Sequence, residues 1–179
     1  VFRLLDPPLH EFVPRTEEKK AEVARELGVS VEEIEKRGES LHEVNPMMGH
    51  RGVRLHVSFP LIAEVEYRAI FTAAAELQQE GLHPVPEIMI PVTISARELS
   101  FQKAICDRVK AEVEGKYSTT IHYQFGTMIE IPRAALTGDR MARTAQFFSF
   151  GTNDLTQMTF GFSRDDVGTF MGEYLGNKL

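Results

Sequence analysis

Residues 86–113 read PEIMIPVTISARELSFQKAICDRVKAEV, and two different apolar repeats follow each other within this one stretch. Residues 86–92 form a short, nearly continuous apolar run, which is typical of a strand buried on both faces. Ser95 and Glu98 stand three residues apart, as in a capping box, and open a helix. One face of that helix collects Leu99, Gln102, Cys106, Val109 and Val113. The stretch therefore predicts a strand followed by an amphipathic helix.

The same alternation of strand and helix extends along the rest of the chain. Alternating or continuous apolar residues predict further strands at residues 1–5, 52–59, 121–131 and 146–150. Helices are predicted from Thr16 to Leu27, from Ser30 to about Glu43, from Pro60 to Gly81 and over 133–143. About five strands joined by crossover helices, with no hairpin signal between them, predict an α/β fold with a parallel sheet.

Two predicted helices define faces of the expected core. In the helix that begins at Pro60, apolar residues recur every three or four positions. They indicate a single buried stripe of Ile62, Val65, Ala69, Ala73 and Leu77. On the helix that begins after Ser95, Cys106 shares the apolar face, so we interpret it as a core residue and not as a nucleophile.

The composition is that of an ordinary globular protein, with 42% hydrophobic and 26% charged residues among 179. No apolar run approaches the ~18 residues that a membrane-spanning helix needs, so we expect a soluble protein with no membrane partner. The single cysteine excludes an internal disulfide framework. A formal net charge of -6 excludes a global basic field for nucleic acid, and any anionic ligand must therefore be bound by locally placed arginines.

Candidate functional residues follow the predicted strands, because parallel α/β folds collect functional groups at the carboxyl ends of their strands. Arg3 lies in the first strand, and Glu130 and the segment Gly151-Thr152-Asn153-Asp154 follow later ones. Each has an ordinary alternative: Arg3 as an edge residue in a salt bridge, Asp154 as a helix N-cap. Taken together, Glu130 and Asp154 could converge on one Mg²⁺ ion. Arg3 and Arg51 would then supply bidentate donors for a phosphoryl group or a carboxylate.

Three longer motifs carry a resemblance to a known family. Residues 45–52 (NPMMGHRG), 126–134 (GTMIEIPRA) and 148–157 (FSFGTNDLTQ) resemble the C-terminal barrel of the phosphoenolpyruvate-utilising enzymes. Residues 3–8 (RLLDPP) and 158–166 (MTFGFSRDD) are similar to the dikinases of that family that act on pyruvate and phosphate. The resemblance covers essentially the whole chain. It implies an incomplete (β/α)₈ TIM barrel, with about five of its eight parallel strands and their crossover helices.

The resemblance also implies a reaction and a role for each candidate residue. Such dikinases interconvert ATP, phosphate and pyruvate with AMP, diphosphate and phosphoenolpyruvate, by phosphoryl transfer through a phosphohistidine to the enolate of pyruvate. By resemblance, Arg3 and Arg51 contact the phosphoryl group, and Glu130 and Asp154 bind Mg²⁺. Gly151, Thr152 and Asn153 line the pyruvate pocket. The expected partners are pyruvate or phosphoenolpyruvate and the phosphohistidine domain of the same parent chain. That parent is expected to be a homodimer of the cytoplasm, a plastid or a glycosome-like organelle.

The two ends of the chain suggest that it is a fragment. Val1 opens directly on a predicted strand, and the chain stops at Leu179 without a clear final element. The resemblance implies that the nucleotide-binding and phosphohistidine domains, the final barrel segments and the family's Gly-x-Cys-Gly-Glu-His segment are all absent. We therefore expect no turnover by this chain alone.

Two alternatives stay open. One is a stand-alone truncated homologue that serves as a non-catalytic binding module. It would be favoured if, in the coding sequence, no barrel strand precedes Val1 and no cysteine segment follows Leu179. The other is an aldolase-like lyase on a related barrel, against which the run Ser163-Arg164-Asp165-Asp166 argues.

Overall fold

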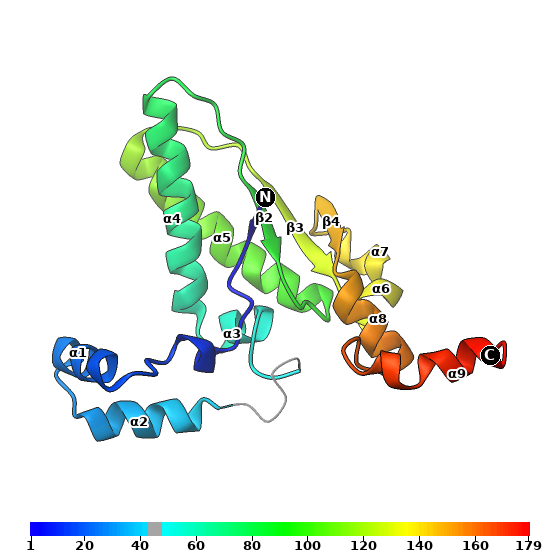
Figure 1. Cartoon of the computed structure of the whole chain (residues 1–179). Coiled ribbons are helices and arrows are strands. Elements are labelled where there is room, and N and C mark those ends of the chain that lie inside the picture. The colour runs from blue at the N-terminus through cyan, green and yellow to red at the C-terminus, as the bar shows by residue number, and fades with distance from the viewer. Residues whose placement is uncertain (43–47) are drawn as a thin grey trace.

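The computed structural model describes residues 1–42 and 48–179, and its centre is a parallel sheet (Figure 1). The sheet contains β1 (Phe2–Arg3), β2 (Glu87–Ile90), β3 (Gln124–Ile129) and β4 (Phe147–Phe150), in the order β1-β2-β3-β4. Phe2 pairs with Ile88, Ile88 with Phe125, and Gly126 with Phe147, all in parallel register. The α/β fold with crossover helices is confirmed, and the described strands form an open sheet with β1 and β4 at its edges.

Two long helices provide the main crossovers and cover the sheet. α4 (Pro60–Gln79) precedes β2, α5 (Ala96–Tyr117) joins β2 to β3, and the two helices pack against each other (Figure 1). The predicted helix over 133–143 is two short helices, α6 (Pro132–Leu136) and α7 (Gly138–Met141). The core lies between this helical layer and β2 and β3. Its members include Tyr67, Phe71, Ile88, Ile90, Cys106, Val109 and Phe125.

The prediction of a strand at 52–59 is wrong, because Val53–Ser58 form the short helix α3. β1 pairs directly with β2, so the position beside β1 where an intervening strand would pair is already occupied. Val53 and Leu55 are fully buried, whereas Val57 and Phe59, the other half of the alternating set, are 42% and 48% exposed. The few apolar residues of a six-residue segment fit both the two-residue period of a strand and the 3.6-residue period of a helix. Tertiary packing decides between the two structures.

The prediction for the buried face of α4 is also wrong. The buried residues are Ala63, Tyr67, Phe71, Ala74 and Ala75. Val65, on the predicted stripe, is 69% exposed. α4 carries apolar residues on two faces, and the face with the two aromatic rings contacts the core because it buries more apolar area.

The prediction for α5 is confirmed in both its beginning and its face. Ser95 Oγ accepts a hydrogen bond from Glu98 N, and the Glu98 carboxylate accepts one from Ser95 N, which completes the capping box. All five residues of the predicted face are buried, including Cys106. Burial raises the pKa of the Cys106 thiol to about 12, which supports its interpretation as a core residue.

The remaining elements lie at the margins of the sheet (Figure 1). On one side are the 3₁₀ turn η1 (Leu9–Phe12) and the helical pair α1 (Glu17–Leu27) and α2 (Val31–Ser40). Thr16 caps α1, and Gly28 ends it in a left-handed conformation. The predicted end of the next helix, at about Glu43, lies outside the described residues.

On the other side are α8 (Thr152–Phe160), η2 (Val167–Thr169) and α9 (Met171–Gly176), none of which has a fully buried residue. None of the helices within the described ranges is both long and apolar enough to span a membrane.

Candidate functional site

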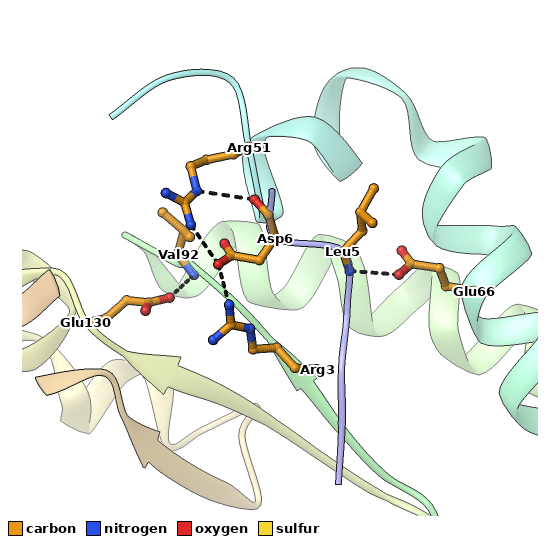
Figure 2. A network of polar contacts seen from close by, with 7 residues as sticks. All are labelled: Arg3, Leu5, Asp6, Arg51, Glu66, Val92 and Glu130. Carbon is orange, nitrogen blue, oxygen red and sulfur yellow. Dashed lines mark hydrogen bonds and ion pairs between the residues drawn. The ribbon is translucent and has the colours of Figure 1, made fainter. Parts of the chain in front are cut away.

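Charged residues from three strand ends meet at the carboxyl edge of the sheet (Figure 2). Asp6 follows β1, Val92 follows β2 and Glu130 follows β3. Asp154 lies in the first turn of α8, which follows β4. This arrangement is the one that the parallel topology favours, because all carboxyl ends of the strands open at the same edge.

Asp6 joins the two predicted arginines. Its Oδ2 accepts hydrogen bonds from Nη2 of Arg3 and, at 2.7 Å, from Nη2 of Arg51. Arg51 also donates from Nε to the Asp6 carbonyl oxygen at 3.2 Å. The Asp6 side chain is 6% exposed and that of Arg51 16%, whereas the Arg3 side chain is 44% exposed. Asp6 therefore orients two guanidinium groups, one of which opens to solvent.

Glu130 is held by the backbone that follows β2. Its Oε1 accepts a hydrogen bond of 2.6 Å from Val92 N (Figure 2). Val92 has a φ of 58°, which is rare for a β-branched residue and costs on the order of 1–3 kcal/mol. Such strained backbone is typical of functional sites, and here it directs a buried N–H at a carboxylate.

Gly52 and Gly151 permit close approaches within this cluster. A Cβ at Gly52, whose φ is 55°, would lie 2.8 Å from Val92 Cγ2. A Cβ at Gly151 would lie 2.6 Å from both Cβ and Oε2 of Glu130. Any side chain at Gly151 would therefore displace the Glu130 carboxyl group.

Glu130 lies beside Asp154, and the two form a carboxyl pair. Burial, the largest cause, raises the pKa of Glu130 to about 7, together with the charges of Asp6 and Asp154 and a hydrogen bond with Asp154, while Val92 N–H opposes the shift. Within the described residues, neither carboxylate of the pair forms an ion pair with Lys or Arg. A cation between them would therefore relieve a like-charge contact.

The donor set fits Mg²⁺, since this ion usually takes one or two carboxylates and completes its shell with water and substrate oxygens. Among the residues that the structure describes, no three His, Cys, Asp or Glu side chains are grouped so that they could hold a metal ion. Glu130 and Asp154 are the residues that would hold it, and most coordination positions would stay open for ligand.

The structure brings together most, but not all, of the predicted site residues. Arg3, Arg51, Glu130, Gly151 and Asp154 belong to the cluster. Thr152 and Asn153 are exposed in the first turn of α8, and no hydrogen bond or ion pair connects them to it. Residues 45–47 of the first motif lie outside the described part of the chain.

Sequence reasoning missed three supporting groups. Asp6 was visible as the acidic residue at the end of the first strand, directly before Pro7. No feature of the sequence indicated that the backbone N–H of Val92 would contact the site. Glu66, on α4, accepts a hydrogen bond of 2.7 Å from Leu5 N (Figure 2) and lies 2.8 Å from Nε2 of the fully buried His56. These contacts attach the end of β1 to the helical layer.

A parallel sheet with paired guanidinium groups and paired carboxylates at one edge defines an α/β protein with a candidate site for an anion and a hard cation. Over residues 1–173 the chain matches the family described as PEP-utilising enzyme, PEP-binding domain, and it belongs to that family.

Individual relatives carry a more specific name. The chain is 54% identical over 178 residues to pyruvate, phosphate dikinase of Clostridium symbiosum, and 51% identical over 178 residues to that of Giardia intestinalis. It is 53% identical over 180 residues to chloroplastic pyruvate, phosphate dikinase 1 of Arabidopsis thaliana. These matches cover 99% of this chain but only 19–20% of each relative, so the chain spans about a fifth of their length.

Proposed function

We propose that this chain is the pyruvate- and phosphoenolpyruvate-binding part of a pyruvate, phosphate dikinase. The observation that carries the proposal is that Asp6 accepts hydrogen bonds from both Arg3 and Arg51. These contacts lie close to the carboxyl pair of Glu130 and Asp154. The same strand edge thus offers positive charge for a phosphoryl group and oxygen ligands for a cation. Identity above 50% to dikinases over 99% of the chain supports this assignment.

The two arginines would bind and orient the phosphoryl group. A guanidinium group donates two parallel hydrogen bonds to phosphate oxygens and stays charged at every physiological pH. Arg51 donates hydrogen bonds to Asp6 from Nε and Nη2, so its guanidinium group has a fixed orientation. The more exposed Arg3 can follow the phosphoryl group as it moves. Together they would offset the negative charge that spreads over the equatorial oxygens during transfer.

The carboxyl pair would place substrate oxygens beside those arginines. Bound Mg²⁺ supplies Lewis-acid stabilisation of negative charge on the carboxylate and carbonyl oxygens of pyruvate. Val92 N–H holds one Glu130 oxygen, and Gly151 leaves space for the other, so the carboxylate keeps one orientation. Thr152 and Asn153, exposed at the start of α8, would line the pyruvate pocket once substrate is bound.

Other groups of the reaction would come from the rest of a longer polypeptide. The phosphohistidine that delivers the phosphoryl group and the domain that binds ATP are assigned to that polypeptide, as is the acid that protonates the enolate. Cys106 does not replace this acid, because it is fully buried in α5. On this proposal the chain alone does not turn over, and the complete protein is a homodimer of the cytoplasm or an organelle.

The test separates the site from the rest of the reaction. In the complete polypeptide, Glu130→Gln is expected to abolish exchange of the pyruvate methyl protons with solvent, because the amide is a weaker cation ligand. ATP-dependent phosphorylation of histidine should persist. Arg51→Ala should lower the rate of phosphoryl transfer to pyruvate by roughly a hundredfold or more, because it removes a fixed hydrogen-bond donor to the transferred group.

Arg68→Ala is the matched control for Arg51→Ala, because Arg68 is a surface residue that pairs with Glu112 on the neighbouring helix. Its transfer rate should equal that of the parent. Normal proton exchange in Glu130→Gln would overturn the metal assignment, and an unchanged transfer rate in Arg51→Ala would remove this residue from the phosphoryl site.

A further inference from the structure

Four arginines gather around a second hollow, which none of the residues assigned above lines. The cavity has a volume of about 840 Å³ and is lined by Ile94, Ser95, Ala96, Arg97, Ser100, Arg133, Thr137, Arg140, Arg143 and Thr144. One wall is formed by the first turn of α5 and the residues just before it, and the other by α6, α7 and the residues that follow α7. We call this hollow the arginine groove.

The charge of the arginine groove is unusual for this chain. The protein carries a net charge of -6, yet the lining contains four arginines and no acidic residue. Arg3 and Arg51 share Asp6, and Arg68 and Arg108 pair with glutamates. Arg97, Arg133, Arg140 and Arg143 form no ion pair with a carboxylate among the described residues, which is also true of other arginines such as Arg15 and Arg25. The groove is distinguished by the gathering of four such arginines around one hollow whose lining contains no acidic residue.

The groove lies between two helical segments. Ser95, Arg97 and Ser100 come from the N-cap and the beginning of α5, whereas Arg133 belongs to α6 and Arg140 to α7. The two walls contact each other where Ser100 Oγ and Thr144 Oγ1 lie 3.2 Å apart.

The groove lies beside the central strands of the sheet. Its walls follow β2 and β3, whereas any further strand would pair at β1 or β4. A further strand would therefore not pair within the groove.

The lining chemistry selects a phosphate-type ligand. All four cations are arginines and none is a lysine, so each offers a planar fork that matches two oxygens of a phosphate group. Hydroxyl groups of serine and threonine supply further donors. Four separate guanidinium groups over this volume exceed what a single phosphate can engage. We propose that the arginine groove binds a small oligophosphate anion, such as inorganic diphosphate, at a site separate from the Arg3 and Arg51 pair.

Hydrogen exchange measured by mass spectrometry tests this proposal, because it locates binding within the complete polypeptide whatever other anion sites it contains. Millimolar inorganic diphosphate should slow exchange in peptides that cover 94–100 and 132–145. Monophosphate should need a higher concentration for the same protection. The double variant Arg140→Gln/Arg143→Gln should raise the half-saturating diphosphate concentration about tenfold or more, since two charge-assisted contacts are lost.

Arg15→Gln/Arg25→Gln is the matched control, because it removes the same charge from two exposed arginines at and near α1. It should leave the protection unchanged, and unaltered exchange over 87–90 in all variants would show that the core is intact. Absence of protection, or equal protection in the groove variant, overturns the proposal. Protection that needs no added anion and disappears in the groove variant also overturns it, and assigns the groove to an acidic segment of the polypeptide.

Discussion

Asp6 and Glu130 determine the geometry of the candidate site through opposite kinds of contact. Asp6 is a buried acceptor shared by two cations, so its own charge is compensated. Glu130 accepts a hydrogen bond from Val92 N–H but lies beside a second carboxyl group, and burial and like charge raise its pKa to about 7. Asp6 positions the arginines, and on the proposed function Glu130 would bind a cation.

The space at Gly151 gives the first prediction at the residue scale. Gly151→Ala would insert a Cβ 2.6 Å from the Glu130 carboxyl group, and we expect the folded state to lose about 1–3 kcal/mol through overpacking. Urea unfolding measures this change. Gly115→Ala is the control, because Gly115 lies in α5 with no atom within 4 Å of an added Cβ. It should stabilise the protein by roughly 0.5–1 kcal/mol, and a similar loss in both variants would contradict the steric argument.

The buried thiol gives a second prediction. The folded state holds the Cys106 pKa at about 12, whereas an unfolded thiol titrates near ~8.5. The thiol is protonated in both states below ~8.5, so its contribution to stability is complete there and is lost as the pH rises toward 12. The unfolding free energy should therefore fall with pH above ~8.5, by at most ~1.4 kcal/mol per pH unit from this group.

Cys106→Ala isolates the effect of the thiol, because it should unfold with a smaller pH slope than the parent over that range. Alkylation of Cys106 should also be slow in the folded protein at neutral pH and fast in urea. Rapid alkylation of the folded protein would contradict the placement of Cys106 in the core.

At the scale of elements, α4 and α5 differ in how clearly their sequences specify a buried face. α5 has one apolar face, and its Lys103–Asp107, Arg108–Glu112 and Lys110–Glu114 pairs lie outside that face. α4 has two apolar faces, and only contact with α5 and the sheet selects the one with Tyr67 and Phe71. The Tyr67 hydroxyl donates to Gln102 Oε1 of α5 at 3.0 Å, a contact between elements that no local pattern contains.

The choice of face on α4 is tested by two truncations on the same helix. Phe71 is fully buried with its ring edge-to-face against Tyr123, so Phe71→Ala should destabilise the protein by about 3–5 kcal/mol. Val65→Ala should change the unfolding free energy by less than about 0.5 kcal/mol, since Val65 is 69% exposed. Chemical denaturation compares the two. A larger loss of unfolding free energy in Val65→Ala than in Phe71→Ala would indicate that the face containing Val65 is the buried one.

At the scale of the whole molecule, the sheet of the described chain has two open edges, β1 and β4, each with an exposed phenylalanine. Phe2 is 51% exposed and Phe150 63% exposed. Unpaired edge strands with apolar side chains favour pairing with another chain, while the charge of -6 opposes it. Because salt screens charge, the balance should shift toward association as ionic strength rises.

The 179-residue chain by itself should therefore associate reversibly, and more strongly in high salt. Analytical ultracentrifugation should detect this as a sedimentation coefficient that rises with protein concentration. Phe150→Lys should weaken the association because a charge on an edge strand disfavours pairing. Phe101→Lys, on the surface of α5 and 44% exposed, is the control and should have a smaller effect. A monomer at every concentration and salt level would contradict the role of the edges.

Much of this structure could be predicted from local patterns, and the failures share one cause. The capping box at Ser95, the buried run of β2 and the αL end of α1 at Gly28 depend on residues within a few positions of one another. The segment 52–59 failed because its alternating apolar residues also fit a short helix, and the pairing of β1 with β2 decided the outcome. Strand-end positions and motifs predicted Arg3, Arg51, Glu130 and Asp154 as site residues, but they did not predict that Asp6 joins the two arginines.

The sequence by itself determined the four strands of the sheet, the core face of α5 and the family, because periodicity, caps and motifs depend on neighbouring residues. Only the tertiary structure decided which face of α4 is buried and how the site is held together. The contacts responsible join residues far apart in the chain: Asp6 with Arg51 across 45 positions, Val92 with Glu130 across 38, and Leu5 with Glu66 across 61. Such contacts form only when the parallel strands bring their carboxyl ends to one edge, and no short window of sequence contains both partners.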